Sequence, residues 1–189
     1  GEDGPQARSA EALRAEGSLS RAFERGAVVL AVCAGFQIVG LSYPGPDGSE
    51  LPGVGLLECR TRKGPGRRAV GELVAEAAPG SGLPRLTGYE NHAGVTQRGP
   101  GVAPLGRVLA GVGNGVGDRS EGALAGRLVG TYMHGPVLAR NPALADLLLS
   151  WVVGPLAPLD DSEVERLRAE RLAAAGGGRR LLAGLGARG

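Results

Sequence analysis

Apolar and polar residues separate most clearly over positions 27–40, which read AVVLAVCAGFQIVG. The continuous apolar run 27–32 is rich in β-branched valine, a composition typical of a strand that is buried on both faces. Cys33 follows at once, and two small residues lead from it into a second apolar stretch. The pattern therefore predicts a buried strand, a sharp turn at Cys33 and a helix that ends near Leu41.

The sequence on either side of this strand predicts one helix before it and several strands after it. Helical spacing over 9–26 predicts a helix capped by Ser9. Turn-forming residues over 43–53 predict a loop, and KGPGRR at 63–68 predicts a hairpin connection between two strands. Strand-like stretches occupy 53–62, 69–77, 86–96, 107–115 and 127–135.

Two helices are predicted near the C-terminus. An apolar pattern over 142–153 predicts the first, and Ser162 with Glu165 forms a capping box at the start of a polar second helix. The glycine-rich segment 176–189 predicts a loose tail. The chain is therefore divided into a main domain and a C-terminal helix with its tail, 1–158 and 159–189.

The order of these elements predicts an α/β fold. Strands and helices alternate at first and strands dominate later, which indicates a mostly parallel sheet flanked by helices, with an antiparallel extension. A parallel sheet rarely starts with a helix, and GEDGPQ at 1–6 is typical of the end of a glycine-rich loop. We therefore expect that N-terminal strands of the sheet are missing from this chain.

Composition narrows the class of function. The chain has 189 residues and a formal net charge of +2, too little to predict attraction to nucleic acid or to a membrane surface. No apolar run has the length of a membrane span, so no direct membrane anchor is expected. The two cysteines make no disulfide framework and favour a reducing, cytoplasmic setting. Two histidines and two cysteines at wide spacing predict no metal site.

The turn at Cys33 is the first candidate for chemistry. A residue at a strand-to-helix turn is held exposed in a strained conformation, and the adjacent helix N-terminus favours a thiolate. This arrangement is the nucleophile elbow. The alternative is that Cys33 is a small buried hydrophobe, the commonest fate of a lone cysteine. Cys59 lies inside a predicted strand and is expected to be packed or half exposed.

Two histidines are candidates for the base. His134 directly follows the apolar strand 128–133, so it would lie at a carboxyl strand end, where open α/β sheets bind ligands. There it could form a thiolate–imidazolium pair with Cys33. His92, in the glycine-flanked YENHAG, is the rival. Either histidine could instead be an ordinary hydrogen-bonded residue. The glycines of GVGNGVG match neither a P-loop nor a dinucleotide-binding pattern.

Several stretches together resemble a known family. VCAGFQ and TYMHGP are similar to the elbow and the strand-end histidine of the class I glutamine amidotransferases, in the cobyric-acid-synthase-like branch. GEDGPQ, PDGSELPGVGLL, GYENHAGVT, GVGNG and GTYMHGPVLARNP extend the resemblance to the GatD family, the glutaminase subunits of lipid II isoglutaminyl synthase. The resemblance spans Gly1 to about Leu149 and implies a flavodoxin-like fold.

The resemblance assigns roles to particular residues. It implies that Cys33 is the nucleophile, that His134 is the general base, and that the backbone N–H groups of Ala34 and of the element ending at Gly1 form the oxyanion site. Glutamine would be held by the elbow residue Gln37 and by an arginine. That arginine is Arg68, with Arg67 as the alternative, and the loop beside the glutamine pocket comprises Tyr89, Glu90, Asn91 and His92.

The resemblance also implies the reaction and its setting. L-glutamine would be hydrolysed through a cysteine thioester, and ammonia would pass to a MurT-like ATP-dependent ligase that amidates the D-glutamate of lipid II. This chain would need no cofactor, because ATP and Mg²⁺ are used by the partner. The complex would work in the cytoplasm, at the inner face of the plasma membrane. Two alternatives stay open: ammonia supply to another acceptor, such as a cobyrinic-acid-type amidation, and a catalytically silent binding homologue.

One position departs from the broad class. Triad glutaminases carry a glutamate two residues after the catalytic histidine, but here that position holds Pro136. His134 must then be oriented by another group. Glu90 is the best substitute within this chain, whereas the resemblance implies an aspartate supplied by the partner ligase across the interface.

Overall fold

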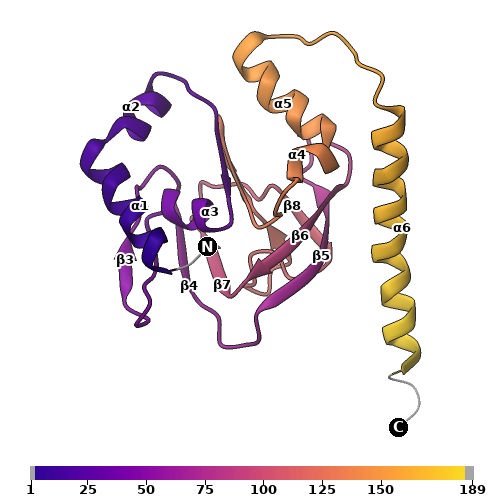
Figure 1. Cartoon of the computed structure of the whole chain (residues 1–189), viewed down its shortest axis with the longest axis horizontal. Coiled ribbons are helices and arrows are strands. Elements are labelled where there is room, and N and C mark those ends of the chain that lie inside the picture. Colours follow the sequence, from indigo (N-terminus) through magenta and orange to yellow (C-terminus); the bar gives the residue numbers. More distant parts are fainter. Residues whose placement is uncertain (1–2, 186–189) are drawn as a thin grey trace.

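The computed structural model describes residues 3–185, and Figure 1 shows strands at the centre with helices around them. The strands form three small sheets, in the orders β1-β11-β10, β3-β2-β4-β7 and β6-β5-β8-β9. The strands are β1 (Val29–Val32), β2 (Ser42–Pro44), β3 (Glu50–Pro52), β4 (Cys59–Lys63), β5 (Ala69–Ala77), β6 (Leu86–His92), β7 (Gly94–Arg98), β8 (Gly106–Ala110), β9 (Ser120–Glu121), β10 (Ala123–Ala125) and β11 (Leu128–Thr131). The helices are α1 (Asp3–Glu16), α2 (Ser18–Glu24), α3 (Ala34–Val39), α4 (Val137–Arg140), α5 (Pro142–Val153) and α6 (Ser162–Leu185).

The parallel pair β1 and β11 forms the centre of the molecule. Its register places Val32 opposite Thr131, so both strands end at the same edge of the sheet. Side chains of β11 alternate between two apolar cores, because successive residues of a strand point to opposite faces. Leu128 packs in the core that contains Phe36, whereas Val129 packs in the core that contains Leu144.

Parallel pairing is less extensive than the sequence indicated. Among residues 3–185 only β1–β11 and β2–β4 are parallel, and the other strand pairs are antiparallel. The predicted strands 53–62 and 69–77 correspond to β4 and β5, but these do not form a hairpin. β4 pairs with β2 and β7, whereas β5 pairs with β6 and β8. The segment 63–68 therefore crosses between two sheets, and the hairpin prediction is wrong.

The N-terminal helical region differs from the prediction at both ends. α1 begins at Asp3, so Ser9 lies inside the helix and does not cap it. Gly17, with φ of +60°, separates α1 from α2, since this left-handed conformation suits glycine and interrupts the helix. The predicted loop 43–53 contains the short antiparallel pair β2–β3. Its turn is closed by Asp47, whose carboxylate accepts hydrogen bonds from the backbone N–H and the hydroxyl of Ser49.

The C-terminal helices are close to their predicted positions. α5 covers the predicted range 142–153, with Pro142 in its first turn. α6 begins at Ser162, but the predicted capping box is absent from the described contacts: the N–H of Glu165 donates to Asp161 O, and Asp160 accepts the N–H of Ser162. The helix continues to Leu185, into the segment predicted as a loose tail, and 186–189 lie outside the described residues.

Candidate active site

Cys33 occupies a sharp turn between β1 and α3. Its backbone has φ of 52° and ψ of −107°, an uncommon conformation for a residue with a side chain. The N–H of Cys33 donates to Thr131 O at 2.8 Å, and its carbonyl accepts the N–H of Gln37 at 3.1 Å. The turn is therefore tied to β11 on one side and begins α3 on the other. Strained backbone of this kind clusters at functional sites. The predicted turn is present, but the Cys33 residue is only 6% exposed, so the expectation that it is held exposed is wrong.

Gly130, and not Gly35 after Cys33, allows the close packing behind the elbow. A Cβ atom added at Gly35 would meet only the Cβ of Ala31, at 4.0 Å, which is ordinary contact. A Cβ added at Gly130, on β11, would overlap the ring of Phe36. Gly130 therefore lets α3 lie directly on the strand, and this packing fixes where α3 begins.

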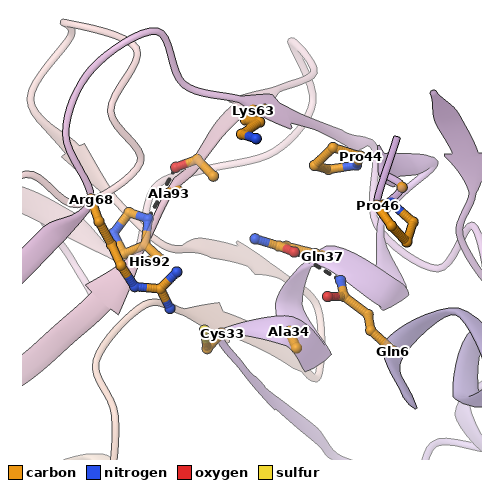
Figure 2. Close-up of a pocket in the computed structure, with 12 residues that line it drawn as sticks. Gln6, Cys33, Ala34, Gln37, Pro44, Pro46, Lys63, Arg68, His92 and Ala93 are labelled. Carbon is orange, nitrogen blue, oxygen red and sulfur yellow. Dashed lines mark hydrogen bonds between the residues drawn. The ribbon is translucent and has the colours of Figure 1, made fainter. Parts of the chain in front are cut away.

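Cys33 borders a cavity of about 220 Å³, which Figure 2 shows between the elbow and the loop around His92. This volume suits a small ligand such as an amino acid and lies below the usual range for cofactor sites, roughly 300–1,000 Å³. The cavity is mostly polar. Its walls come from α1, α3, the β2–β3 turn, β4, and the β6–β7 junction, and its lining residues are Gln6, Cys33, Ala34, Gln37, Pro44, Gly45, Pro46, Lys63, Arg68, His92, Ala93 and Gly94.

Arg68 is the arginine that reaches this cavity. Its Nε donates to Asn91 Oδ1 at 2.5 Å and its Nη2 donates to Asn91 O at 3.0 Å. Figure 2 shows its guanidinium directed toward the space above Cys33. Both arginines are exposed, but Arg67 is not among the lining residues. The geometry therefore favours Arg68 over Arg67 as a ligand for an anionic group.

Gln37 is fixed in the cavity wall by a chain of hydrogen bonds. Its Oε1 accepts from Gln6 Nε2 at 2.8 Å, and its Nε2 donates to the hydroxyl oxygen of Tyr132 at 3.2 Å. The Tyr132 hydroxyl also bonds to Thr96 Oγ1 at 2.6 Å, and Thr96 bonds to Thr61 at 2.8 Å. Burial raises the pKa of Tyr132 to about 12. These bonds hold the amide of Gln37 in one orientation, which pre-organises that wall.

His92 lies in the wall opposite α3 and is 3% exposed. Its Nδ1 donates to Gly94 O at 3.0 Å, and its ring stacks on Tyr132 with centroids 3.7 Å apart. Its Nε2 lies 3.5 Å from a carboxylate oxygen of Glu90. Both nitrogens thus face protein groups away from Cys33, which makes His92 a wall residue. Gly94 must lack a side chain here, because a Cβ would come within 2.5 Å of Gln37 Nε2.

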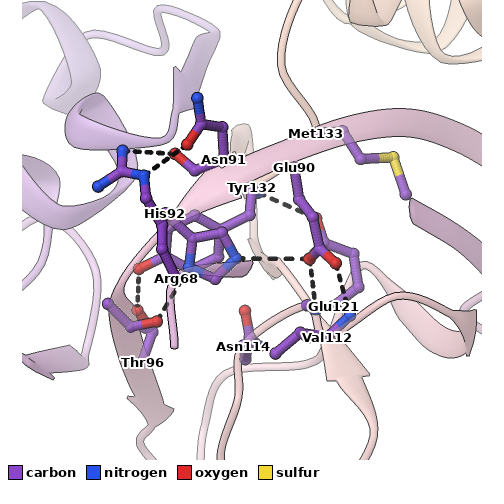
Figure 3. Close-up of polar contacts among 12 residues, drawn as sticks. Arg68, Glu90, Asn91, His92, Thr96, Val112, Asn114, Glu121, Tyr132 and Met133 are labelled. Carbon is purple, nitrogen blue, oxygen red and sulfur yellow. Dashed lines mark hydrogen bonds and ion pairs between the residues drawn. The ribbon is translucent and has the colours of Figure 1, made fainter. Parts of the chain in front are cut away.

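Glu90 is buried, and Figure 3 shows its carboxylate beside the His92 ring. Its carboxylate accepts the N–H of Val112 at 2.7 Å and the N–H of Gly113 at 2.9 Å. It therefore anchors the start of the GVGNGVG segment, where Gly111, Gly113, Gly115 and Gly117 all have positive φ. Among the described contacts Glu90 makes none with His134, so the geometry does not support it as the acid that orients that histidine.

His134 follows β11 at the same sheet edge as Cys33. Its N–H donates to Tyr89 O at 2.7 Å, which fixes the backbone, while the Tyr89 side chain is 37% exposed. Its Nε2 is buried and has no hydrogen-bond partner in the part of the chain that the structure describes. Burial, followed by the charges of His92 and Arg68, lowers the pKa of His134 and favours the neutral imidazole that a base requires.

Within residues 3–185 no hydrogen bond joins His134 to Cys33, and His134 is not among the residues that line the cavity. Catalytic hydrogen bonds often tighten only when substrate binds. Gly1, the predicted second source of an oxyanion donor, lies outside the described residues. The structure thus places Cys33, Ala34, Gln37, Arg68 and His92 at one cavity, and His134 beside it.

Cys59 contrasts with Cys33. It lies in β4, is 2% exposed, and burial raises the pKa of its thiol to about 11. The 2% exposure confirms Cys59 as a packed residue, and burial disfavours its thiolate. The described residues contain no group of three or more His, Cys, Asp or Glu side chains that could hold a metal ion. They also contain no helix with the length and apolarity needed to cross a bilayer.

Sequence reasoning missed several residues of the site. Gln6 and Tyr132 hold Gln37, and Lys63 lines the cavity. Glu121 is fully buried behind β11. The only sequence signal for Glu121 is an isolated carboxylate in an otherwise small and apolar segment, 120–125. Such a pattern does not distinguish a buried acid from a residue in an exposed turn.

Comparisons with known proteins agree with this geometry. Residues 3–142 match the model of the CobB/CobQ-like glutamine amidotransferase domain. The chain is 39% identical over 131 residues to the lipid II isoglutaminyl synthase (glutamine-hydrolyzing) subunit GatD of Staphylococcus aureus, an alignment that covers 69% of this chain and 51% of the relative. It is 32% identical over 133 residues to the GatD subunit of Streptococcus pneumoniae, covering 70% and 50%.

More distant similarities point the same way. A cobyric acid synthase of Rhodobacter capsulatus is 35% identical over 133 residues, covering 65% of this chain and 26% of the relative. A solved glutamine amidotransferase structure superposes with a TM-score of 0.59 at 23% identity, covering 77% of this chain and 74% of the other, which indicates the shared fold. The chain spans about half the length of the two GatD subunits that it matches.

Proposed function

Because the chain belongs to the CobB/CobQ-like glutamine amidotransferase family, we propose that it is the glutamine-hydrolysing part of an amidotransferase. The observation that carries the proposal is the backbone of Cys33, held at positive φ at the start of α3 and at the edge of a small polar cavity. Arg68 in the same cavity suits the α-carboxylate of glutamine, because a guanidinium can bind a carboxylate with two parallel hydrogen bonds.

The first half of the reaction forms a thioester. His134 takes the proton of the Cys33 thiol, and the thiolate attacks the side-chain carboxamide carbon of glutamine. The N–H of Ala34 stabilises the oxyanion that develops, an effect worth about 3 kcal/mol per donor in related acyl-transfer sites. The C–N bond then breaks, and the protonated His134 gives its proton to the leaving nitrogen, so ammonia departs and a glutamyl thioester remains.

The second half returns the enzyme to its starting state. Water attacks the thioester carbon while His134 accepts its proton, the C–S bond breaks, and glutamate leaves. The thiolate then regains the proton from His134. In this scheme Gln37 positions the substrate, and Tyr89, Asn91 and His92 form the adjacent wall with Glu90 as its interior anchor. No cofactor takes part in these steps.

The acceptor of the ammonia is proposed from the relatives. The two GatD proteins are subunits of lipid II isoglutaminyl synthases, so the proposed partner is a MurT-like ligase that uses ATP and Mg²⁺ to amidate the D-glutamate of lipid II. The reaction would take place in the cytoplasm at the inner face of the plasma membrane. The similarity to cobyric acid synthases keeps a cobyrinic-acid-type acceptor as the second candidate.

The partner is also the proposed source of the third catalytic group. Pro136 cannot bond to the His134 ring, Glu90 is engaged elsewhere, and His134 Nε2 has no partner in the described part of the chain. An aspartate presented across the interface would orient and stabilise the imidazolium. Ammonia would then be released slowly by the free subunit and at the full rate only in the assembled complex.

The proposal is tested with the complete protein and its co-purifying ligase. We expect 6-diazo-5-oxo-norleucine, a glutamine-like electrophile, to label Cys33 and glutamine to protect it. Mass spectrometry of the labelled peptides locates the modified cysteine. A catalytically silent binding homologue would show no labelling at Cys33, and the identity of the ligase would separate the two acceptors.

A further inference from the structure

Glu121 is a buried acid that the proposed reaction does not use. It lies at the end of β9, behind the central sheet, and its exposed fraction is 0%. One carboxyl oxygen, Oε1, accepts the hydroxyl of Thr131 at 2.5 Å and the N–H of Tyr132 at 3.0 Å. The other oxygen, Oε2, is buried and has no hydrogen-bond partner among the described residues. The side chain thus binds the end of β11 through one carboxyl oxygen only.

The segment that Glu121 holds is connected to four residues of the proposed site. The carbonyl of Thr131 accepts the N–H of Cys33 at 2.8 Å. The Tyr132 hydroxyl holds Gln37, and the Tyr132 ring stacks on His92. His134 follows two residues later. Figure 3 shows Glu121, Glu90, His92 and Tyr132 gathered at this point.

The surroundings of Glu121 favour a neutral carboxyl group. From β6 the charged or titratable neighbours are Glu90, which opposes a negative charge, and His92, which favours it. The Thr131 hydroxyl at the end of β11 and the following Tyr132 N–H both donate to Glu121 and favour its charged form. β8 places Gly106 opposite Glu121, and Arg107 is exposed. Burial is the dominant effect and raises the pKa of Glu121 to about 7.

We propose that Glu121 is a positioning residue that, as a neutral carboxylic acid, holds the Thr131–Tyr132 peptide and thereby the Cys33 backbone and His134 in the reacting geometry. The inference rests on the proposed function of Cys33 and His134. When Glu121 ionises, its Oε2 atom shares the negative charge without a hydrogen-bond donor, and this charge lies close to the Glu90 carboxylate. The strand end then loosens, because relief of that charge requires water or a movement of the side chain.

The kinetic test uses the complete protein with its ligase partner and compares Glu121→Gln, a neutral side chain of the same shape, with Glu121→Ala. We expect Glu121→Ala to lower kcat for glutamine hydrolysis at least about tenfold with little change in KM. We expect Glu121→Gln to keep most of the rate at pH 6. The ratio of its kcat to that of the unchanged protein should rise between pH 6 and pH 8, because titrations shared by both proteins cancel. The surface variant Glu76→Gln is the control and should give a constant ratio near one.

A second measurement does not depend on catalysis. Hydrogen exchange at the Cys33 and Tyr132 amides should accelerate at least about tenfold in Glu121→Ala. At pH 8, exchange at these amides should be slower in Glu121→Gln than in the unchanged protein. Amides in β5 should be unaffected in both variants. A pH-independent kcat ratio, or a Glu121→Ala protein with full kcat and unchanged exchange at Cys33, overturns the proposal. Failure of Cys33 labelling would instead overturn the proposed function, since exchange at the strand end would still report on Glu121.

Discussion

Two regions of this chain hold a buried cysteine, and they differ in backbone and surroundings. Cys33 stands at a strained turn between β1 and α3, beside a polar cavity. Cys59 lies inside β4 in extended backbone, and burial raises its thiol pKa to about 11. The exposed fractions of the two residues are similar, 6% and 2%. The two cysteines are therefore similarly buried, and only the strained backbone and the adjacent cavity set Cys33 apart as the proposed nucleophile.

The largest expected effect follows directly from this contrast. In the assembled complex, Cys33→Ala should abolish glutamine-dependent ammonia release, since loss of the attacking thiol removes the covalent route and costs about six orders of magnitude in comparable triads. Cys59→Ala should leave the release largely intact. Ammonia is measured for both variants under the same conditions. Normal release by Cys33→Ala would remove the distinction between the two cysteines.

The cavity beside Cys33 can be tested with a matched pair of arginines. Both arginines are exposed, but Arg68 lines the cavity and is held by Asn91, whereas Arg67 does not line it. We expect Arg68→Ala to raise the KM for glutamine by roughly 10- to 100-fold, because a charged hydrogen-bonded pair is worth about 1.5–3 kcal/mol. Arg67→Ala should change KM less than twofold, a limit that we take as about 0.4 kcal/mol. Equal, small effects would mean that neither arginine binds the substrate.

The next test asks whether glutamine hydrolysis at Cys33 depends on the ligase partner. The protein without ligase should hydrolyse glutamine slowly, and addition of the ligase should raise the rate at least about tenfold, a modest demand for general-base assistance. Glu90→Gln should keep most of that stimulated rate per folded molecule. It will lower stability by about 1–2 kcal/mol, because an amide can accept only one of the two N–H groups that the carboxylate binds.

Two outcomes together would contradict this arrangement. If the free subunit is already fully active and Glu90→Gln silences it without unfolding, the orienting acid is internal. Circular dichroism of each variant separates loss of activity from loss of folded protein. The partner would then supply only the ammonia acceptor.

The smallest expected effects concern the packing that holds the elbow. Gly130→Ala should destabilise the fold by about 1–3 kcal/mol, because its Cβ would overlap the Phe36 ring. Gly35→Ala should change the free energy of unfolding little, or raise it slightly, since its Cβ has room and alanine favours helices. Urea unfolding measures both. A larger loss for Gly35→Ala would place the critical close approach after Cys33 instead of on β11.

The sequence by itself determined the elements whose pattern is local. Residues 29–32 of the predicted strand 27–32 form β1, the turn falls at Cys33, and α5 covers 142–153. These assignments depend on continuous apolar runs, helical periodicity and small residues at a turn, all of which are contained in adjacent residues. The family resemblance, carried by short stretches in order, was confirmed by the match over residues 3–142.

Only the tertiary structure decided which strands pair and which polar groups meet. The segment 63–68 was predicted as a hairpin connection, but β4 and β5 pair with other strands, since strand pairing depends on partners far along the chain. Glu90 is adjacent to the pocket in sequence yet binds backbone N–H groups behind it. Glu121 is ten residues from Thr131 and becomes a buried acid only because β9 brings it behind β11. Burial and hydrogen-bond partners are properties of the packed molecule, and no local pattern in the sequence encodes them.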